Sequence, residues 1–309
     1  MVFVVNLNPA VDRICKLDEL RPGEVNRLTY ARNIAGGKGV NVASVLAKNG
    51  TEVAISGFLG GHNGRFIAEA VRNRGIYDAF VMTQANTRCN TNIIAQDNTV
   101  TEVLEAGEPV SEAELAVFMD VYEKQTERAK VVVLSGSLPK GVPADIYQRL
   151  ITIAKKKQCI TILDSAGEAL KRGILGKPDY IKPNLAELCE LVGLAEKTEE
   201  AVYEACMQLQ AQGISNVFVS MGEAGLRALT KQAYYLAGVP KITVKNTVAC
   251  GDCVVAAMAM GCEYGWNEEE CVRKAAAMSA ANATTEENGD MPQEVIDKLL
   301  GEIKLEIRK

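Results

Sequence analysis

The chain has 309 residues, of which 48% are apolar and 24% charged, and its formal net charge is −5. This length and composition allow a substantial buried core, as one large α/β domain or as one domain with an appendage. The acidic balance argues against a nucleic-acid partner, because phosphate-backbone binding needs a basic face. No apolar run approaches the roughly 20 residues that span a membrane, and residues 1–5 lack the basic start of a signal peptide. We therefore expect a cytoplasmic enzyme that does not bind membranes.

Short apolar runs alternate with amphipathic stretches, which predicts a parallel sheet with crossover helices. Several runs end at a small or polar residue, as expected where the carboxyl ends of strands line a ligand crevice. The strands expected in this way include residues 1–5, 131–134, 160–163 and 217–219. Helices are predicted at residues 40–48, 63–74, 111–128, 144–156, 198–212, 251–261, 268–282 and 292–303.

Two segments, residues 11–34 and 86–107, are extended, polar and rich in turns. Alternating residues such as those of Cys89–Ile94 predict strands within them. They form either a pair of surface hairpins or a small sheet of their own. The chain has no internal repeat and no linker rich in Pro, Gly or Ser, so we expect residues 1–309 to form a single domain with these segments inserted.

The turn Asn246–Asp252 leads directly into the apolar run Val254–Met260. Such a helix start presents unpaired backbone N–H groups and the positive end of the helix dipole, which together bind anions. Asp252 would stand in the first helical turn, where it could accept a proton from an attacking hydroxyl. The alternative is an ordinary capping aspartate before a core helix.

A second glycine-rich turn, Ala35–Ala43, also enters a helix and carries Lys38 and Asn41. It is neither a Walker A loop nor a dinucleotide-binding fingerprint, because the spacing of its glycines and its closing residues differ from both. Together with four other segments in the same order, the two turns resemble the PfkB-type carbohydrate kinases of the ribokinase-like superfamily. The six segments are Asn6–Asp12, Gly36–Gly39, Ser135–Pro139, Lys182–Glu187, Val219–Gly225 and Gly251–Asp252.

This resemblance implies a ribokinase-like α/β fold of three layers, in which helices flank a mostly parallel central sheet. Residues 11–34 and 86–107 would form a small β-sheet lid over the substrate site. It also implies an enzyme that uses ATP and Mg²⁺. Exposed strand edges in residues 86–107 would invite uncontrolled association, so we expect the lids of two chains to pair in a homodimer.

The resemblance assigns roles to individual residues. Asp252 is the base, and the backbone N–H groups of Ala249, Cys250 and Gly251 stabilise the transferring phosphoryl group. Asn184 and Glu187 hold Mg²⁺ largely through water. Taken singly, they would be better explained by helix capping and a solvated helix face, but in this order of motifs we favour the functional roles. The nucleotide-binding residues are Lys182, Asn184, Ser220, Gly222, Gly225 and Asn282. The substrate-binding residues are Asp12, Arg27, Gly37, Lys38, Asn41, Arg88, Asn90 and Ser137.

The pattern Thr87-Arg88-x-Asn90 resembles the phosphosugar kinases of this family, in which the arginine binds a substrate phosphate. Among these, 1-phosphofructokinases and tagatose-6-phosphate kinases are the most similar. We expect the chain to convert fructose-1-phosphate into fructose-1,6-bisphosphate. Tagatose-6-phosphate is the alternative substrate, because Thr101–Glu105 is closer to the kinases of that sugar and Asn92 replaces a lysine common in 1-phosphofructokinases.

Ala249 and Cys250 depart from the Gly-Ala-Gly-Asp or Gly-Ser-Gly-Asp of most relatives. Alanine costs little at this position if its φ is negative, and related sugar kinases use it there, so we expect activity to survive. Cys250 near the phosphates could make the enzyme thiol-sensitive, because a helix N-terminus lowers the pKa of a thiol. Two other classes of function remain open. One is a catalytically weak regulator that binds sugar phosphates. The other is a metal or redox protein built on Cys250 and Cys253, whereas a histidine-based mechanism is unfavoured with His62 as the single histidine.

Overall fold

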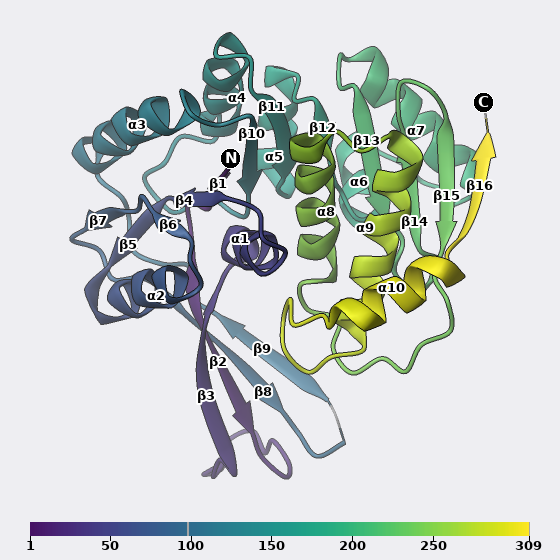
Figure 1. Cartoon of the computed structure of the whole chain (residues 1–309). Helices are drawn as coiled ribbons and strands as arrows, with labels where there is room; N and C mark the ends of the chain where they lie inside the picture. The colour runs from purple at the N-terminus through teal and green to yellow at the C-terminus, as the bar shows by residue number, and fades with distance from the viewer. Residues whose placement is uncertain (98, 309) are drawn as a thin grey trace.

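The structure is a computed structural model that describes residues 1–97 and 99–308. Residue 98, inside the predicted segment 86–107, and residue 309 lie outside the described part. A ten-stranded sheet crosses the molecule in the order β16-β15-β14-β13-β12-β11-β10-β1-β4-β6 (Figure 1). Its strands are β1 (Val2–Val5), β4 (Val53–Ser56), β6 (Tyr77–Asp78), β10 (Val131–Ser135), β11 (Ile160–Asp164), β12 (Tyr180–Ile181), β13 (Asn216–Ser220), β14 (Leu226–Leu229), β15 (Tyr234–Gly238) and β16 (Lys304–Arg308).

The strands from β6 to β13 pair in parallel, whereas β14, β15 and β16 are antiparallel to their neighbours. The mostly parallel sheet expected from the sequence is therefore confirmed. Both faces of the sheet are covered, which explains why its strands are almost continuously apolar. Successive residues of β1 illustrate this, because Phe3 packs into the core on one face and Val4 into the core on the other.

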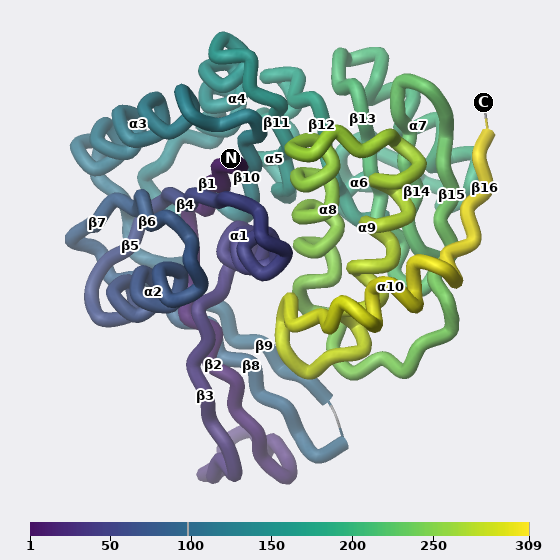
Figure 2. Tube along the Cα trace, in the orientation of Figure 1, coloured from purple at the N-terminus to yellow at the C-terminus, as the bar shows by residue number. Residues whose placement is uncertain are grey.

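Helices cover the two faces and complete three layers (Figure 2). Residues of α1, α2, α8, α9 and α10 pack into one core, and residues of α3, α4, α5, α6 and α7 pack into the other. The helices are α1 (Lys38–Lys48), α2 (Gly61–Asn73), α3 (Glu112–Thr126), α4 (Ile146–Lys156), α5 (Gly167–Gly173), α6 (Leu185–Val192), α7 (Glu199–Ala211), α8 (Cys250–Tyr264), α9 (Glu268–Ala283) and α10 (Gln293–Glu302). None of the described helices combines the length and apolar character that a membrane crossing requires.

The eight helices expected from the sequence are all present, and each begins and ends within three residues of its predicted limits. Two helices were not predicted, α5 and α6. They have 7 and 8 residues, which is too short for the spacing of apolar residues to reveal a helix.

The segments predicted to be extended form a small sheet in the order β3-β2-β8-β9. Its strands are β2 (Ala10–Lys16), β3 (Tyr30–Gly36), β8 (Cys89–Ile94) and β9 (Val100–Leu104). Two antiparallel hairpins, β2–β3 and β8–β9, are joined by parallel pairing of β2 with β8. The hairpins are therefore one sheet, as the resemblance implied.

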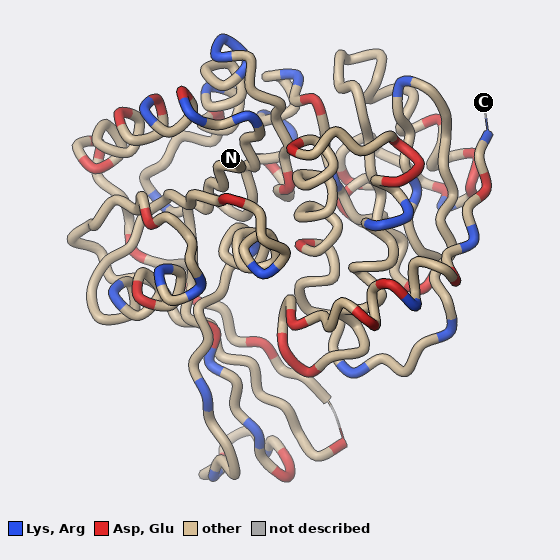
Figure 3. Tube along the Cα trace, viewed as in Figure 1, with Lys and Arg blue, Asp and Glu red and all other residues tan. Residues whose placement is uncertain are grey.

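The small sheet projects from the body of the molecule and is tied to it by four stretches of chain (Figure 1). Residues 6–9 lead from β1 into the small sheet, and residue 37 leads from it to α1. Residues 84–88 lead into it from β7 (Val81–Thr83), and residues 105–111 lead from it to α3. β7 pairs with β5 (Phe58–Gly60) in a separate two-stranded sheet. Figure 3 shows acidic residues in the segment between α9 and α10, and there Glu287 Oε1 is 2.7 Å from Nη1 of Arg32 on β3.

Candidate active site

The predicted anion-binding turn forms the start of α8. Ala249 precedes the helix with a φ of 64°, and Cys250 is the first helical residue. The negative φ that would make alanine inexpensive at this position is therefore not found. The chain bends into the left-handed region there, which costs a residue other than glycine about 1–2 kcal/mol. The first backbone N–H groups of α8 have no intrahelical acceptors and can stabilise an anion at this turn.

Asp252 stands in the first turn of α8 and is buried. Its Oδ2 accepts a hydrogen bond of 2.8 Å from Asn41 Nδ2, so the two glycine-rich turns meet as expected from the sequence. Burial raises the pKa of Asp252 to about 6, and the carboxylate of Asp164 adds to the effect, while Asn41 and the ammonium groups of Lys38 and Lys182 oppose it. A carboxylate with this pKa is ionised at neutral pH and can accept a proton.

Two lysines converge on Asp164, at the end of β11. The Nζ atoms of Lys38 and Lys182 are each 3.3 Å from Asp164 Oδ1, and Lys38 Nζ is also 3.7 Å from Glu187 Oε1. The carboxylate of Asp164 is the main reason that the pKa of Lys38 is raised, so this side chain stays cationic. A Cβ added to Gly251 would lie 3.3 Å from Lys182 Nζ, which locates this ammonium beside the start of α8.

Asp164 had no role in the sequence-based assignment, although it belongs to this group. The available signal was its place at the carboxyl end of an apolar strand, next to the crevice that such ends line. That position alone does not reveal that its carboxylate balances two lysines from α1 and from the segment before α6.

The small sheet brings a second set of predicted residues together. Asp12 on β2 and Asn90 on β8 are directly paired, and Asn90 Nδ2 donates a hydrogen bond of 2.9 Å to Asp12 Oδ1. Burial raises the pKa of Asp12, and this effect outweighs the hydrogen bond from Asn90 and the nearby charge of Arg88. Gly37 joins the small sheet to α1 with a φ of 103°, a conformation that favours glycine.

Arg88 lies where the chain enters β8. Its Nη2 donates to Asn8 O at 3.0 Å and its Nη1 to Glu105 O at 3.2 Å. Asn8 Nδ2 in turn donates to Ser137 Oγ at 3.2 Å, so Arg88 and Ser137 contact the same residue. The guanidinium Nε of Arg88 is buried and has no partner among the described residues.

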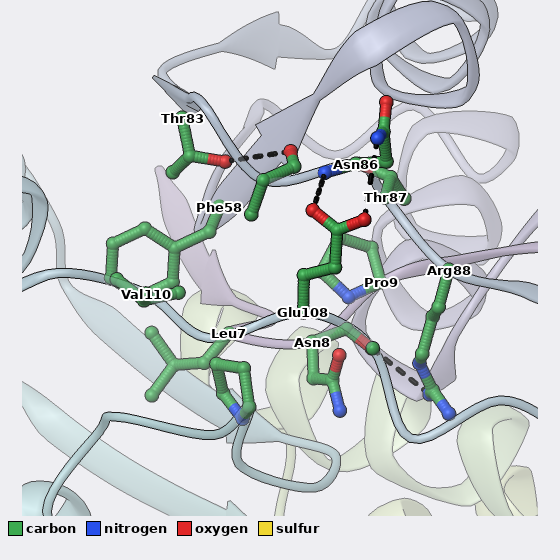
Figure 4. A pocket seen from close by; sticks show the side chains of 13 residues that line it. Leu7, Asn8, Pro9, Phe58, Thr83, Asn86, Thr87, Arg88, Glu108 and Val110 are labelled. Carbon is green, nitrogen blue, oxygen red and sulfur yellow. Dashed lines mark hydrogen bonds between the residues drawn. The ribbon is translucent and has the colours of Figure 1, made fainter.

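A cavity of about 30 Å³ lies beside Arg88 (Figure 4). This is room for one or two water molecules, not for a sugar. Leu7 and Phe58 contribute apolar walls, while Glu108 accepts hydrogen bonds from the backbone and side-chain nitrogens of Asn86 at 2.9 and 3.3 Å. The predicted contact of Arg88 with a phosphate therefore requires the open side of the guanidinium, away from this cavity.

Arg27 is not part of this group. It lies in the exposed connection between β2 and β3, at the far end of the small sheet, and it makes no hydrogen bond or ion pair with the described residues. Its assignment beside Arg88 is not supported within one chain, because the small sheet extends away from the other substrate-binding residues.

The residues assigned to the nucleotide lie at neighbouring strand ends. Ser220 ends β13 and forms an isolated bridge with Asn184, while Gly222 and Gly225 flank the short turn before β14. Asn184 and Glu187 form a capping box at the start of α6: Asn184 Oδ1 accepts from the N–H of Glu187, and Glu187 Oε2 accepts from the N–H of Asn184, both at 2.8 Å. Asn184 therefore caps α6, as the alternative interpretation proposed. Glu187 Oε1 takes no part in the capping box and is 3.7 Å from Lys38 Nζ.

Asn282 is fully buried, and its amide is engaged within the protein. Its Nδ2 donates to Val248 O at 2.8 Å and to Cys250 Sγ at 3.2 Å, and its Oδ1 accepts from the N–H of Gly289 at 2.7 Å. The side chain consequently holds the turn before α8 and has no polar atom free for the predicted nucleotide contact.

The cysteines of this turn behave differently from the expectation. Burial raises the pKa of Cys250 and outweighs the hydrogen bond from Asn282, which lowers it, so the lowered pKa expected at the helix N-terminus is wrong. Cys253 is fully buried, and its pKa is raised for the same reason. All nine cysteines are free, and no three His, Cys, Asp or Glu side chains gather as metal ligands in the described residues. Cys250 and Cys253 thus lack the further ligands of a zinc site.

Solved structures share this fold over almost the whole chain. Escherichia coli phosphofructokinase-2 in complex with potassium has a TM-score of 0.91 at 25% identity and covers 97% of this chain and 98% of its own. The tetrameric inhibited form of the same protein has a TM-score of 0.89 at 25% identity, with the same coverage. The predicted ribokinase-like fold is therefore confirmed.

Curated relatives extend the comparison to the sequence. The tagatose-6-phosphate kinase of Staphylococcus epidermidis is 34% identical over 308 residues, and the 1-phosphofructokinase of Bacillus subtilis is 33% identical over 305 residues. Each alignment covers 99% of both chains. The model of the pfkB family carbohydrate kinases matches residues 3–294. The chain therefore belongs to the pfkB family of carbohydrate kinases.

Proposed function

We propose that the chain transfers a phosphoryl group from ATP to a ketohexose phosphate, with fructose-1-phosphate as the acceptor and fructose-1,6-bisphosphate as the product. The observation that carries this proposal is the position of Asp252. Its carboxylate is buried at the N-terminus of α8, accepts a hydrogen bond from Asn41 and has a pKa of about 6. A carboxylate of this kind, beside a helix start that binds anions, can act as the general base for an alcohol.

In the proposed reaction, the acceptor oxygen forms a bond to the γ-phosphorus while the bond from phosphorus to the β–γ bridging oxygen breaks. The hydroxyl proton passes to Asp252, and ADP leaves with the electrons of the broken bond. The N–H groups of Ala249 to Gly251 and the ammonium groups of Lys38 and Lys182 neutralise the charge that spreads over the phosphoryl oxygens. The distances that join the lysines, Asp164 and the start of α8 support these roles.

Mg²⁺ is the proposed metal of this reaction, and the residues fit it. Glu187 offers a carboxylate oxygen whose neighbour is Lys38 Nζ at 3.7 Å, and carboxylates together with substrate phosphates and water are the ligands that Mg²⁺ favours. Asn184 would contribute through water. When bound, the ion neutralises phosphate charge and orients the transferring group.

The sugar would lie between Asp12, Asn90 and Lys38, with its phosphate on the open side of Arg88 and near Ser137. Fructose-1-phosphate and tagatose-6-phosphate both carry a phosphate at the end of the sugar opposite the acceptor hydroxyl. The same arrangement of Arg88 and Asp252 therefore suits either. The pattern Thr87-Arg88-x-Asn90 favours fructose-1-phosphate, whereas the segment Thr101–Glu105 and the relative named tagatose-6-phosphate kinase favour the alternative.

A coupled ADP-release assay tests the proposal with fructose-1-phosphate, fructose-6-phosphate, tagatose-6-phosphate and unphosphorylated hexoses. We expect the highest kcat/KM with fructose-1-phosphate. A higher kcat/KM with tagatose-6-phosphate would establish the alternative. Binding of a sugar phosphate without ADP release, in protein with Asp252 intact, would indicate the regulator instead of the enzyme.

A homodimer through the small sheets is part of the proposal. The exposed apolar side chains of Tyr30, Val100 and Leu104 share one face with Asp12 and Asn90, by the pairing of β3, β2, β8 and β9. A second small sheet would bury this apolar face and close over the substrate. Light scattering that detects a strict monomer at micromolar concentration would contradict the dimer.

A further inference from the structure

Three neighbouring strands end in buried polar side chains with unpaired atoms. The atoms are Nδ2 and Oδ1 of Asn6, Oγ of Ser135 and Oδ2 of Asp164, and none has a hydrogen-bond partner in the described part of the chain. The exposed fraction of each residue is 1% or less. Nine buried side-chain nitrogens and oxygens lack a partner in residues 1–97 and 99–308, and these three residues supply four of them. The unpaired atoms are therefore concentrated at one place.

The three residues lie side by side. β1, β10 and β11 are adjacent, Ser135 is directly paired with Asp164, and Asn6 follows Val5, which is paired with the residue before Ser135. Side chains two residues apart on a strand share a face. The residues two positions earlier, which pack into the core beneath α1 and α8, are Val4, Val133 and Ile162. Asn6, Ser135 and Asp164 therefore form a polar row on that face.

The row connects two substrate loops with the lysine pair. A Cβ added to Gly37 would lie 2.6 Å from Asn6 Nδ2, and one added to Gly136 would lie 3.1 Å from Asn6 Oδ1. The amide of Asn6 is thus wedged between the turn before Lys38 and the loop before Ser137. At the other end of the row, Asp164 holds both lysines through Oδ1, while its buried Oδ2 has no partner in the described part of the chain.

Buried polar atoms without partners are rare in folded proteins, and each calls for a bound water, an ion or a functional role. Neighbouring strands are about 4.8 Å apart, and two hydrogen bonds of about 2.8 Å through one water span this distance. Water also fits the row better than a cation does, because Asn6 Nδ2 is a hydrogen-bond donor and Asp164 already pairs with two ammonium groups. The unpaired atoms of the row offer the two to four partners that a buried water requires.

We propose that ordered water bridges Asn6, Ser135 and Asp164, and that Asn6 and Ser135 are positioning residues for phosphoryl transfer. Acting through Asp164, the row fixes Lys38 and Lys182 relative to the start of α8. The kinetic part of this inference rests on the proposed function, whereas the water site does not. Because misplaced lysines stabilise the transition state less, loss of the row lowers kcat more than it changes the KM for ATP.

Ser135→Ala is the primary variant, because alanine removes the hydroxyl with little change in volume. We expect it to lower kcat about tenfold or more, with the KM for ATP within about threefold of wild type, while the protein remains folded at the assay temperature. Asn6→Leu should act in the same direction. The matched control is Ser56→Ala on β4, because Ser56 Oγ is equally buried but donates a hydrogen bond of 2.8 Å to Ala79 O. The control should lower the melting temperature and leave kcat within about twofold.

A high-resolution crystal structure tests the water directly. The expected result is a solvent peak within hydrogen-bonding distance of Ser135 Oγ and Asp164 Oδ2, which is lost in Ser135→Ala. An ordered structure without that peak would overturn the proposal. So would a Ser135→Ala protein with wild-type kcat, or one that loses activity only in proportion to its folded fraction. If no sugar phosphate supports ADP release by the wild type, the proposed function fails, and the solvent peak still decides the water site.

Discussion

Replacing Asp252 with asparagine should make the folded chain more stable while it removes most of the activity. Burial raises the pKa of Asp252 to about 6 from an ordinary value of 3.8. The folded state therefore binds this proton more tightly than the unfolded state does. Stability from this group is fully present below pH 3.8 and is lost as the pH rises through 6.

The difference between the two pKa values corresponds to about 3 kcal/mol at 1.36 kcal/mol for each pH unit. Above pH 7 the buried, ionised carboxylate lowers the stability of the wild type by this amount. Asp252→Asn avoids the loss, because its amide is neutral. The variant should therefore exceed the wild type in the free energy of unfolding by up to about 3 kcal/mol at pH 8. The difference should shrink as the pH falls from 6 to 4. Its kcat should drop roughly 10²–10⁴-fold, the range for a lost acid or base.

Urea unfolding of both proteins at pH 8, 6 and 4.5, followed by circular dichroism without ligands, measures the difference. A variant that is less stable than the wild type at pH 8, or a difference that does not change with pH, would refute the argument from burial. Near-native turnover in the variant would show that the base lies elsewhere.

In the wild type, kcat/KM should fall about tenfold for each pH unit below the pKa of Asp252, which is about 6, because the base must be ionised. A pH–rate profile that stays flat down to pH 5 would exclude Asp252 as the base. Arg88→Ala should raise the KM for the phosphosugar about 10–100-fold, since a charge-assisted contact is worth about 1.5–3 kcal/mol, and should leave the KM for ATP nearly unchanged. Arg72→Ala is its control, because Arg72 pairs with Asp78 on the surface, and an equal effect of both variants would discount the phosphate contact. Ala249→Gly should stabilise the chain by about 0.5–1 kcal/mol, because the left-handed strain of alanine is removed and this gain exceeds the entropy that glycine loses on folding. A lower melting temperature in this variant would count against the strain.

Much of the fold could be predicted because long elements repeat their pattern many times. α8 and α9 have 15 and 16 residues, and the runs that became β10 and β11 are buried almost throughout. The antiparallel strands β14 to β16 were harder, because a short strand signal does not state the direction of pairing. Pairing is decided by contacts between residues far apart in the sequence.

The candidate site divides in the same way. Asp252, Asn41 and Lys38 could be predicted because each belongs to a local motif of glycines and polar residues. The φ of Ala249 could not, because a motif of residue types does not state the left-handed bend with which the chain enters α8. The pKa of Cys250 and the role of Asn282 also depend on burial, which a local motif does not report.

The four connections of the small sheet determine how the proposed lid can move. Asn8, Gly37 and Arg88 lie in or beside these connections, not at the tip of the sheet. A ligand held there touches the hinge itself. Its size and shape would then set the tilt of the sheet, and because the sheet acts as a lever arm, small differences between sugars at this point would be amplified at Tyr30 and Val100, on its distal part. The tilt angle of the small sheet would thus affect both the choice of substrate and the association of two chains.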